Sequence, residues 1–120
     1  MIVCSTDLVL GRVLARNLEK RGFAVHQLNW EPCYAPLPEG VPTEPDLVIA
    51  DLDCHVVDRW GAITRLNQFF PSVPVVILDY DRPDAGRLEA WRPYRFLSKP
   101  LGVHDLLGLL DELTVEVEVL

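Results

Sequence analysis

The sequence has few basic residues, no long apolar run and few cysteines. Its 11 lysines and arginines are outnumbered by 18 aspartates and glutamates, which gives a formal net charge of −7. A nucleic-acid-binding surface needs clustered Lys and Arg, so we expect no nucleic-acid partner. A membrane span needs ~18 apolar residues and no stretch approaches that length, so we expect no membrane partner either. The expected partner is a protein or a small molecule.

The three cysteines, Cys4, Cys33 and Cys54, are an odd number and lack the spacing of a metal site. Free thiols are typical of a reducing compartment. The chain also begins directly with an apolar strand pattern at residues 2–4, without the basic segment and apolar core of a secretion signal. We therefore predict a cytoplasmic location.

Length and composition indicate one globular domain. Of the 120 residues, 49% are hydrophobic and 24% are charged, which is ordinary for a soluble domain with its own core. We assign residues 1–113 to this domain. Residues 114–120 alternate apolar and acidic side chains, a strand pattern, and we interpret them as a C-terminal tail or linker.

Short apolar runs alternate with amphipathic segments along the chain. The apolar runs predict five strands, at residues 2–4, 23–28, 47–50, 75–78 and 94–97. The amphipathic segments predict four helices, at residues 8–20, 57–70, 84–91 and 103–113. Residues 31–45 hold five of the ten prolines, so we expect an irregular connection there. This order predicts an open parallel α/β sheet with helices on both faces and right-handed crossovers.

Two distant segments end on charged groups that suit one site. Residues 45–51 read Pro-Asp-Leu-Val-Ile-Ala-Asp and residues 96–100 read Phe-Leu-Ser-Lys-Pro, so Asp51 and Lys99 each follow an apolar strand. The carboxyl ends of parallel strands form the crevice in which such sheets bind ligands. An aspartate that faces a lysine there is the centre of a phosphoryl-accepting site.

These features resemble a response-regulator receiver domain over residues 1–113. The resemblance rests on Asp51 at its strand end, on the Lys99-Pro100 pair and on the helix-to-strand junction at residues 21–23. It implies a flavodoxin-like (CheY-like) doubly wound sheet of five parallel strands in the order 2-1-3-4-5, here with a Pro-rich loop in place of the second helix. It also implies a role in a two-component phosphorelay. In that family a histidine kinase phosphorylates the aspartate beside bound Mg²⁺, and a lysine contacts the phosphoryl group. A hydroxyl at the end of the fourth strand then moves to hydrogen-bond the phosphoryl group, and an aromatic residue of the fifth strand follows that motion.

Carried over by position, the resemblance makes Asp51 the phosphoacceptor equivalent, Lys99 the lysine and Phe96 the switch aromatic of the fifth strand. Other positions depart from the family pattern. The acidic pair that follows the first strand falls on Ser5 and Thr6, and the hydroxyl that ends the fourth strand falls on Asp79. The usual Met-Pro after the phosphoacceptor loop falls on residues 54 and 55, which are Cys and His.

These departures predict an impaired site. Mg²⁺ favours carboxylate ligands, so we expect no cofactor, or at most weak Mg²⁺ binding at Asp51 and Asp7. Like charges on Asp79 and Asp51, ~6 Å apart, would repel by about 3 kcal/mol at an effective dielectric of ~20. We expect Asp79 to form an ion pair with Lys99 across the mouth of the pocket. The predicted pocket comprises Ser5, Thr6, Asp7, Asp51, Asp53, Asp79 and Lys99.

Three interpretations of function follow. The first is a pseudo-receiver, not an enzyme, that signals through contacts with a protein such as a histidine kinase or an output protein. In it Asp51 and Lys99 persist mainly as a structural charge cluster. The second is a working receiver phosphorylated on Asp51. The third, from another class, is a phosphocysteine carrier or phosphatase that uses Cys4, and it requires an accessible thiol.

A partner surface is predicted around the fifth strand. Trp91, Tyr94, Arg95 and Phe96 fall on the face that receivers form from their fourth helix, fifth strand and fifth helix. Aromatic residues and arginine are favoured at interface hot spots. We expect protein contacts there, with a homodimer through this face or through the C-terminal tail as one form.

Overall fold

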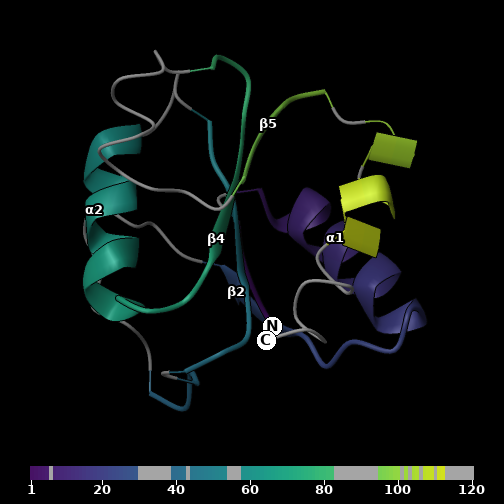
Figure 1. Cartoon of the computed structure of the whole chain (residues 1–120), viewed down its shortest axis with the longest axis horizontal. Coiled ribbons are helices and arrows are strands. Elements are labelled where there is room, and N and C mark those ends of the chain that lie inside the picture. Colours follow the sequence, from purple (N-terminus) through teal and green to yellow (C-terminus); the bar gives the residue numbers. More distant parts are fainter. Residues whose placement is uncertain are drawn as a thin grey trace.

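The computed structural model describes residues 1–5, 7–29, 39–42, 44–53, 58–82, 95–100, 102, 104, 105, 107–109, 111 and 112. These residues form a single sheet with helices on both faces (Figure 1). Within them, no helix has the length and apolar character that a membrane crossing requires.

The sheet has five strands, and every pair of neighbours is parallel. The strands are β1 (Ile2–Ser5), β2 (His26–Asn29), β3 (Val48–Asp51), β4 (Val75–Asp79) and β5 (Arg95–Ser98). Their order across the sheet is β2-β1-β3-β4-β5. The predicted flavodoxin-like topology is confirmed, and β2 lies at a sheet edge.

The strand boundaries differ from the prediction mainly at β2. Its ladder begins at His26, three residues later than the apolar pattern at 23–28 indicates. His26 pairs with Ile2, the first residue of β1, so the ladder of β2 begins where β1 begins. Hydrogen-bonding partners, which the side-chain pattern does not contain, set this boundary.

Helix α1 (Leu8–Lys20) ends where the sequence predicts. Gly22 adopts φ 93°, a left-handed conformation that glycine reaches without a Cβ penalty. Its N–H donates to Glu19 O at 3.0 Å, and the N–H of Phe23 donates to Leu18 O at 3.2 Å. This pair of bonds is a Schellman motif, which stops the helix and turns the chain toward β2.

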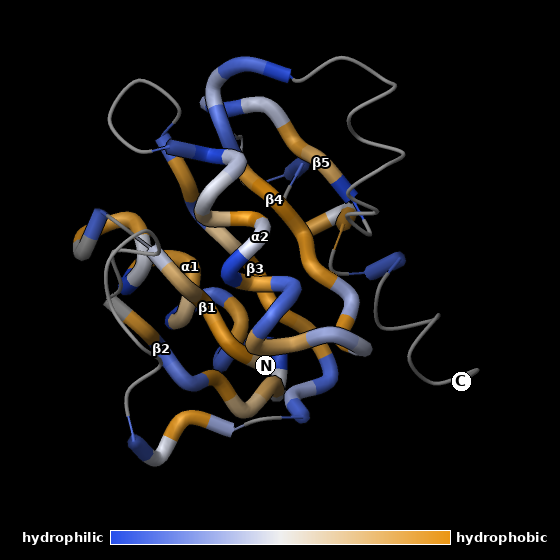
Figure 2. Tube along the Cα trace, turned by 90° about the vertical axis from the view of Figure 1, so that its left-hand side faces the viewer, coloured by the Kyte–Doolittle hydropathy of each residue, from blue (hydrophilic) through white to orange (hydrophobic). Residues whose placement is uncertain are grey.

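The two faces of the sheet carry separate core layers, and the colours of Figure 2 show that β1 and β4 are largely hydrophobic. Helix α2 (Arg59–Phe69) covers one face, whereas α1 and the helical residues within 104–112 cover the other (Figure 1). The α2 side contains, among others, Cys4, Ala50, Ile77 and Phe96 from the strands. The α1 side contains Val3, Ile49, Val76 and Leu78. Successive residues of each strand therefore alternate between the layers, and burial on both faces explains the continuous apolar runs.

Three predicted segments lie outside the described residues: the helix at 84–91, most of the Pro-rich connection, and the tail at 114–120. The parts of the connection that are described, residues 39–42, 44 and 45, contain no helix. The predicted division between a domain and a tail near residue 113 stays a prediction.

Candidate functional site

The carboxyl ends of β1, β3 and β5 bring Ser5, Asp51 and Lys99 to the same face of the sheet. Ser5 is the register partner of Asp51, and Asp51 is the partner of Leu78, which in turn pairs with Leu97. Side chains alternate along a strand, so Lys99, two residues after Leu97, returns to the face of Asp51. The predicted meeting of Asp51 and Lys99 is confirmed.

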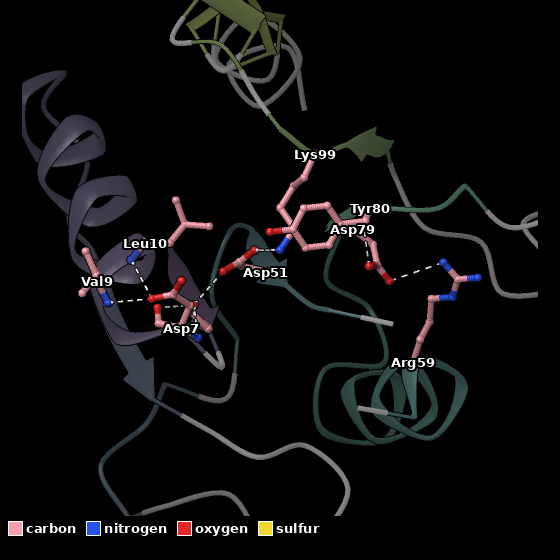
Figure 3. Close-up of polar contacts among 9 residues, drawn as sticks. Asp7, Val9, Leu10, Asp51, Arg59, Asp79, Tyr80 and Lys99 are labelled. Carbon is pink, nitrogen blue, oxygen red and sulfur yellow. Dashed lines mark hydrogen bonds and ion pairs between the residues drawn. The ribbon is translucent and has the colours of Figure 1, made fainter. Parts of the chain in front are cut away.

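Both carboxylate oxygens of Asp51 accept hydrogen bonds (Figure 3). Lys99 Nζ donates to Oδ1 at 2.7 Å, and Ser5 Oγ donates to Oδ2 at 2.7 Å. Ser5 Oγ also lies 2.6 Å from the Asp7 carbonyl oxygen and accepts the Asp7 N–H at 3.0 Å. The hydroxyl has one proton, and the charged carboxylate is its stronger acceptor. Asp51 is only 1% exposed, so these two donors replace its hydration.

Lys99 is almost as buried as the carboxylate that it contacts. Its side chain is 8% exposed, and its Nζ lies 4.6 Å from the centre of the Tyr80 ring. The ammonium therefore has a carboxylate on one side and an aromatic face on another, both of which favour a cation. The ring and the ammonium lie next to each other in Figure 3.

Asp79 does not pair with Lys99, and the predicted ion pair between them is wrong. Its Oδ2 lies 3.3 Å from Arg59 NH1, and its Oδ1 accepts the Tyr80 N–H at 2.7 Å. Arg59 comes from the first turn of α2, and the same NH1 also donates to the backbone oxygen of Asp81. Figure 3 shows the Asp79 carboxylate directed toward Arg59.

The strand register explains this correction. Asp51 is level with Leu78, whose side chain belongs to the α1 side of the core. Asp79 is the next residue, so its side chain points to the opposite face, where α2 supplies Arg59. Asp79 is fully buried and a buried carboxylate needs a partner, which an arginine at the start of α2 provides.

Comparison with known proteins supports the fold assignment. No protein-family model matches the sequence, and no curated protein matches it. Solved structures do match. The non-phosphorylated HemR receiver domain of Leptospira biflexa is 20% identical, with a TM-score of 0.68, over 93% of this chain and 90% of that one. The response regulator TrrA of Thermotoga maritima, solved with Mg²⁺ and BeF, is 13% identical, with a TM-score of 0.63, over 93% and 96% of the two chains.

A response regulator of Burkholderia pseudomallei, solved with a phosphorylated aspartate and a calcium ion, is 22% identical, with a TM-score of 0.62, over 98% of this chain and 69% of that one. The chain has the fold of a receiver domain. At such identities the likeness concerns the backbone, so the chemistry of this receiver fold has to be argued from its own side chains.

Of the two other acidic residues predicted to serve the pocket, Asp7 has a defined structural role in this receiver fold. Asp7 is the N-cap of α1, and its Oδ1 accepts the N–H groups of Val9 at 3.0 Å and Leu10 at 3.2 Å. Asp53 is half-buried after β3 and is not a partner of Asp51. Thr6 lies outside the described residues. Among the residues that are described, no group of three or more His, Cys, Asp or Glu side chains is placed to hold a metal ion.

The Cys4 thiol is unsuited to phosphocysteine chemistry. It is buried in the α2 side of the core, and burial raises the pKa of Cys4 from 9.0 to about 12. A thiol in this state is neither accessible nor ionised near neutral pH, whereas the thiolate is the nucleophile. The third interpretation is therefore wrong.

The predicted partner surface is described in part. Phe96 is buried with its ring 5.6 Å from the Arg82 guanidinium, whereas Arg95 is exposed and lies 3.7 Å from Glu112. A depression of about 510 Å³ between β5 and the C-terminal helical residues includes Arg95 and His104 in its lining. Trp91 and Tyr94 lie outside the described residues, so their place on this face stays a prediction.

Arg59 and Tyr80 are the residues that the sequence reasoning missed. The signal for Arg59 was incomplete: Arg59 is the first residue of α2, but the face on which Asp79 lies depends on the register of Asp51 with Leu78, which the sequence pattern does not contain. The signal for Tyr80 was weaker. An aromatic residue that directly follows a strand is common, and only the position of Lys99 gives its ring a function.

Proposed function

We propose that this chain is a pseudo-receiver: a signalling domain that is not an enzyme, acts through protein contacts and accepts a phosphoryl group poorly at Asp51. The observation that carries the proposal is the state of Asp51. Each of its oxygens is bonded to a donor at 2.7 Å, and none of its described partners is a second carboxylate. Its neighbour across the β1 ladder is a serine.

The Mg²⁺ requirement supports the same proposal. Mg²⁺ demands near-octahedral oxygen ligation and gives up its water reluctantly, so its sites usually include more than one acidic group. Asp51 offers one carboxylate, Ser5 a neutral hydroxyl, and Asp7 uses its Oδ1 to cap α1. The described residues do not fit a Mg²⁺ site, so we propose that metal binding is weak or absent.

The balance of charges also disfavours a phosphoryl group at Asp51. This reason replaces the predicted repulsion between Asp79 and Asp51. The two buried carboxylates, Asp51 and Asp79, are matched by two cations, Lys99 and Arg59. A phosphoryl group would add about −1.5 to −2 charges near Asp51, where Lys99 is the one cation paired with that carboxylate among the described residues. Uncompensated charge is costly in a buried position.

Protein contact is the activity that remains for such a domain. Receiver folds among the solved structures belong to signalling proteins such as HemR and TrrA. The exposed Arg95 and the adjoining depression provide polar groups for a protein partner, such as a histidine kinase, an output protein or a second copy of the chain. The partner and the cytoplasmic location stay predictions.

Phosphoryl transfer tests the proposal directly. The protein is incubated with acetyl phosphate and Mg²⁺, and intact mass is followed with time beside an active receiver as a positive control. We expect no stoichiometric gain of one phosphoryl group. A clean gain that disappears in Asp51→Asn would establish the working-receiver alternative, which the short contact between Asp51 and Lys99 favours.

A gain-of-function variant gives the converse test. Ser5→Asp and Thr6→Asp restore acidic groups after β1, and Asp79→Thr restores the hydroxyl after β4. We expect the triple variant to bind Mg²⁺ and to gain a phosphoryl group at Asp51. Asp79→Thr alone is the matched control, and it should stay unreactive because it supplies no metal ligand.

A further inference from the structure

We propose that Tyr80 is a lid over the Lys99–Asp51 pair and that Arg59 is the positioning residue that holds this lid closed. The inference deepens the proposed function, on which its biological meaning rests, because it adds restricted access to the reasons why Asp51 is a poor phosphoacceptor. Its geometry stands on the described side chains alone.

The lid itself is defined by exposure and contact. Asp51 is 1% exposed and the Lys99 side chain is 8% exposed, although both lie at the carboxyl edge of the sheet, where crevices open. Residue Tyr80 is 46% exposed, so part of it meets solvent. Its ring also lies 4.6 Å from Lys99 Nζ, which places the ring between the ammonium and solvent.

Arg59 holds the backbone on both sides of this ring. Its NH1 donates to the Asp79 side chain and to the Asp81 backbone oxygen, the residues that flank Tyr80. Asp79 Oδ1 in turn accepts the N–H of Tyr80 at 2.7 Å. One guanidinium thus ties α2 to the residues on both sides of Tyr80, which restricts movement of the backbone that carries the ring.

A backbone hydrogen bond also links Asp79 to the end of β5. The N–H of Lys99 donates to the Asp79 backbone oxygen at 2.8 Å. Asp79 therefore touches the start of α2 through its side chain and the β5 end through its carbonyl. A change at Arg59 is expected to reach Lys99 through Asp79 and Tyr80 although Arg59 contacts neither Lys99 nor Asp51.

Amine labelling measures the lid without any phosphodonor. The sequence has two lysines, Lys20 and Lys99, and Lys20 is exposed on α1. The folded protein is treated briefly with N-hydroxysuccinimidyl acetate, and mass spectrometry of its peptides gives the ratio of Lys99 to Lys20 acetylation. We expect Lys99 to be strongly protected, with Lys20 as the internal standard.

Two variants at Tyr80 separate a lid from general loosening. Tyr80→Ala removes the ring and is expected to raise the Lys99/Lys20 ratio about tenfold, through easier local opening. Tyr80→Phe keeps the ring and is expected to leave the ratio unchanged. An unchanged ratio in folded Tyr80→Ala would overturn the lid.

A second set of variants tests the role of Arg59. Arg59→Gln should raise the same ratio, and Arg59→Lys, which keeps a cation beside Asp79, should restore part of the protection. Arg16→Gln, at an exposed position of α1, is the matched control and should change nothing. A folded Arg59→Gln protein with wild-type protection would overturn the positioning role, and the Tyr80 pair decides the lid even if this variant does not fold. Because no phosphoryl group is involved, failure of the pseudo-receiver proposal would leave these ratios unaffected.

Discussion

Asp51 and Asp79 are both buried carboxylates at the ends of neighbouring strands, yet each has its own cation. Asp51 is bonded to Lys99 from the β5 end and to Ser5 from β1. Asp79 is paired with Arg59 from α2 on the opposite face of the sheet. A shift of one residue along the strands is enough to separate the two sites, because successive side chains point to opposite faces.

The difference teaches that each buried carboxylate is compensated by a cation on its own face of the sheet. A lone buried carboxylate is costly, and so is the removal of one partner from a buried pair. On the α1 face the available cation is the lysine at the receiver position. On the α2 face it is Arg59, the first residue of the helix that packs there. The substitution at the end of β4 therefore became a structural ion pair instead of a competitor for Lys99.

The largest effect is expected from breaking the Asp51 pair. Lys99→Met leaves the Asp51 carboxylate buried with Ser5 alone, which should lower the free energy of unfolding by about 3–5 kcal/mol. Denaturant unfolding measures it. In a double-mutant cycle, Asp51→Asn should recover much of the loss, since the uncompensated charge is gone.

The same cycle run with Asp79→Asn tests whether the two sites are separate. Lys99→Met and Asp79→Asn should couple much more weakly than Lys99→Met and Asp51→Asn, because Asp79 is linked to Lys99 through a backbone hydrogen bond and through Tyr80, with no ion pair between their side chains. A coupling of more than about 1 kcal/mol would show that Lys99 interacts directly with Asp79 in solution.

Cys4 extends the comparison of buried titratable groups to one in the core, where burial alone raises the pKa. Because its pKa is raised from 9.0 in the unfolded chain to about 12, the folded state holds its proton more tightly. The resulting stabilisation is complete below pH 9 and is lost as the pH rises toward 12. The free energy of unfolding should fall by up to ~1.4 kcal/mol per pH unit in that window.

Cys4→Ala is the control, because other groups also titrate at high pH. The difference between the two proteins should shrink as the pH rises from 9 toward 12, measured by urea unfolding in matched buffers. A constant difference across this range would mean that the thiol ionises alike in the folded and unfolded chains.

A smaller effect on the free energy of unfolding is expected at Asp7, an acidic residue that was predicted from the sequence to line the pocket. Asp7→Ala removes the cap from two backbone N–H groups of α1 and should cost about 1 kcal/mol. Asp7→Asn should cost much less, since its side-chain oxygen still caps. If Asp7→Asn instead abolished Mg²⁺ binding in the Ser5→Asp, Thr6→Asp, Asp79→Thr variant, Asp7 would belong to the pocket after all.

The smallest effect is expected from a surface pair of the same length as the buried one. Arg21 and Asp111 lie 2.6 Å apart, but their side chains are 33% and 72% exposed. Water screens such a pair, so Arg21→Gln should change the free energy of unfolding by less than about 0.5 kcal/mol. Thermal unfolding beside Lys99→Met shows whether burial, and not distance, sets the strength of these contacts.

The parts of this protein that depend on local pattern were predictable. Apolar runs and, at residues 23–28, alternation identified all five strands, and their succession with helices predicted an open parallel sheet. The order 2-1-3-4-5 was implied by the resemblance to receiver domains. Gly22 marked the end of α1 because only its missing side chain allows the left-handed turn at low cost. Asp51 and Lys99 were predicted to meet because carboxyl ends of parallel strands share one edge. The exact start of β2 was not predictable, since it depends on which residue of β1 lies opposite.

By itself, therefore, the sequence determined the succession of strands and helices along the chain, the edge at which the site lies and the two residues at its centre. These follow from hydrophobic period and chain direction, which are properties of short segments. Only the tertiary structure decided that Asp79 turns to Arg59 and that Tyr80 covers Lys99. Those contacts join residues about twenty apart along the chain, and they depend on register and on where α2 packs, because a charge is compensated by its neighbours in space.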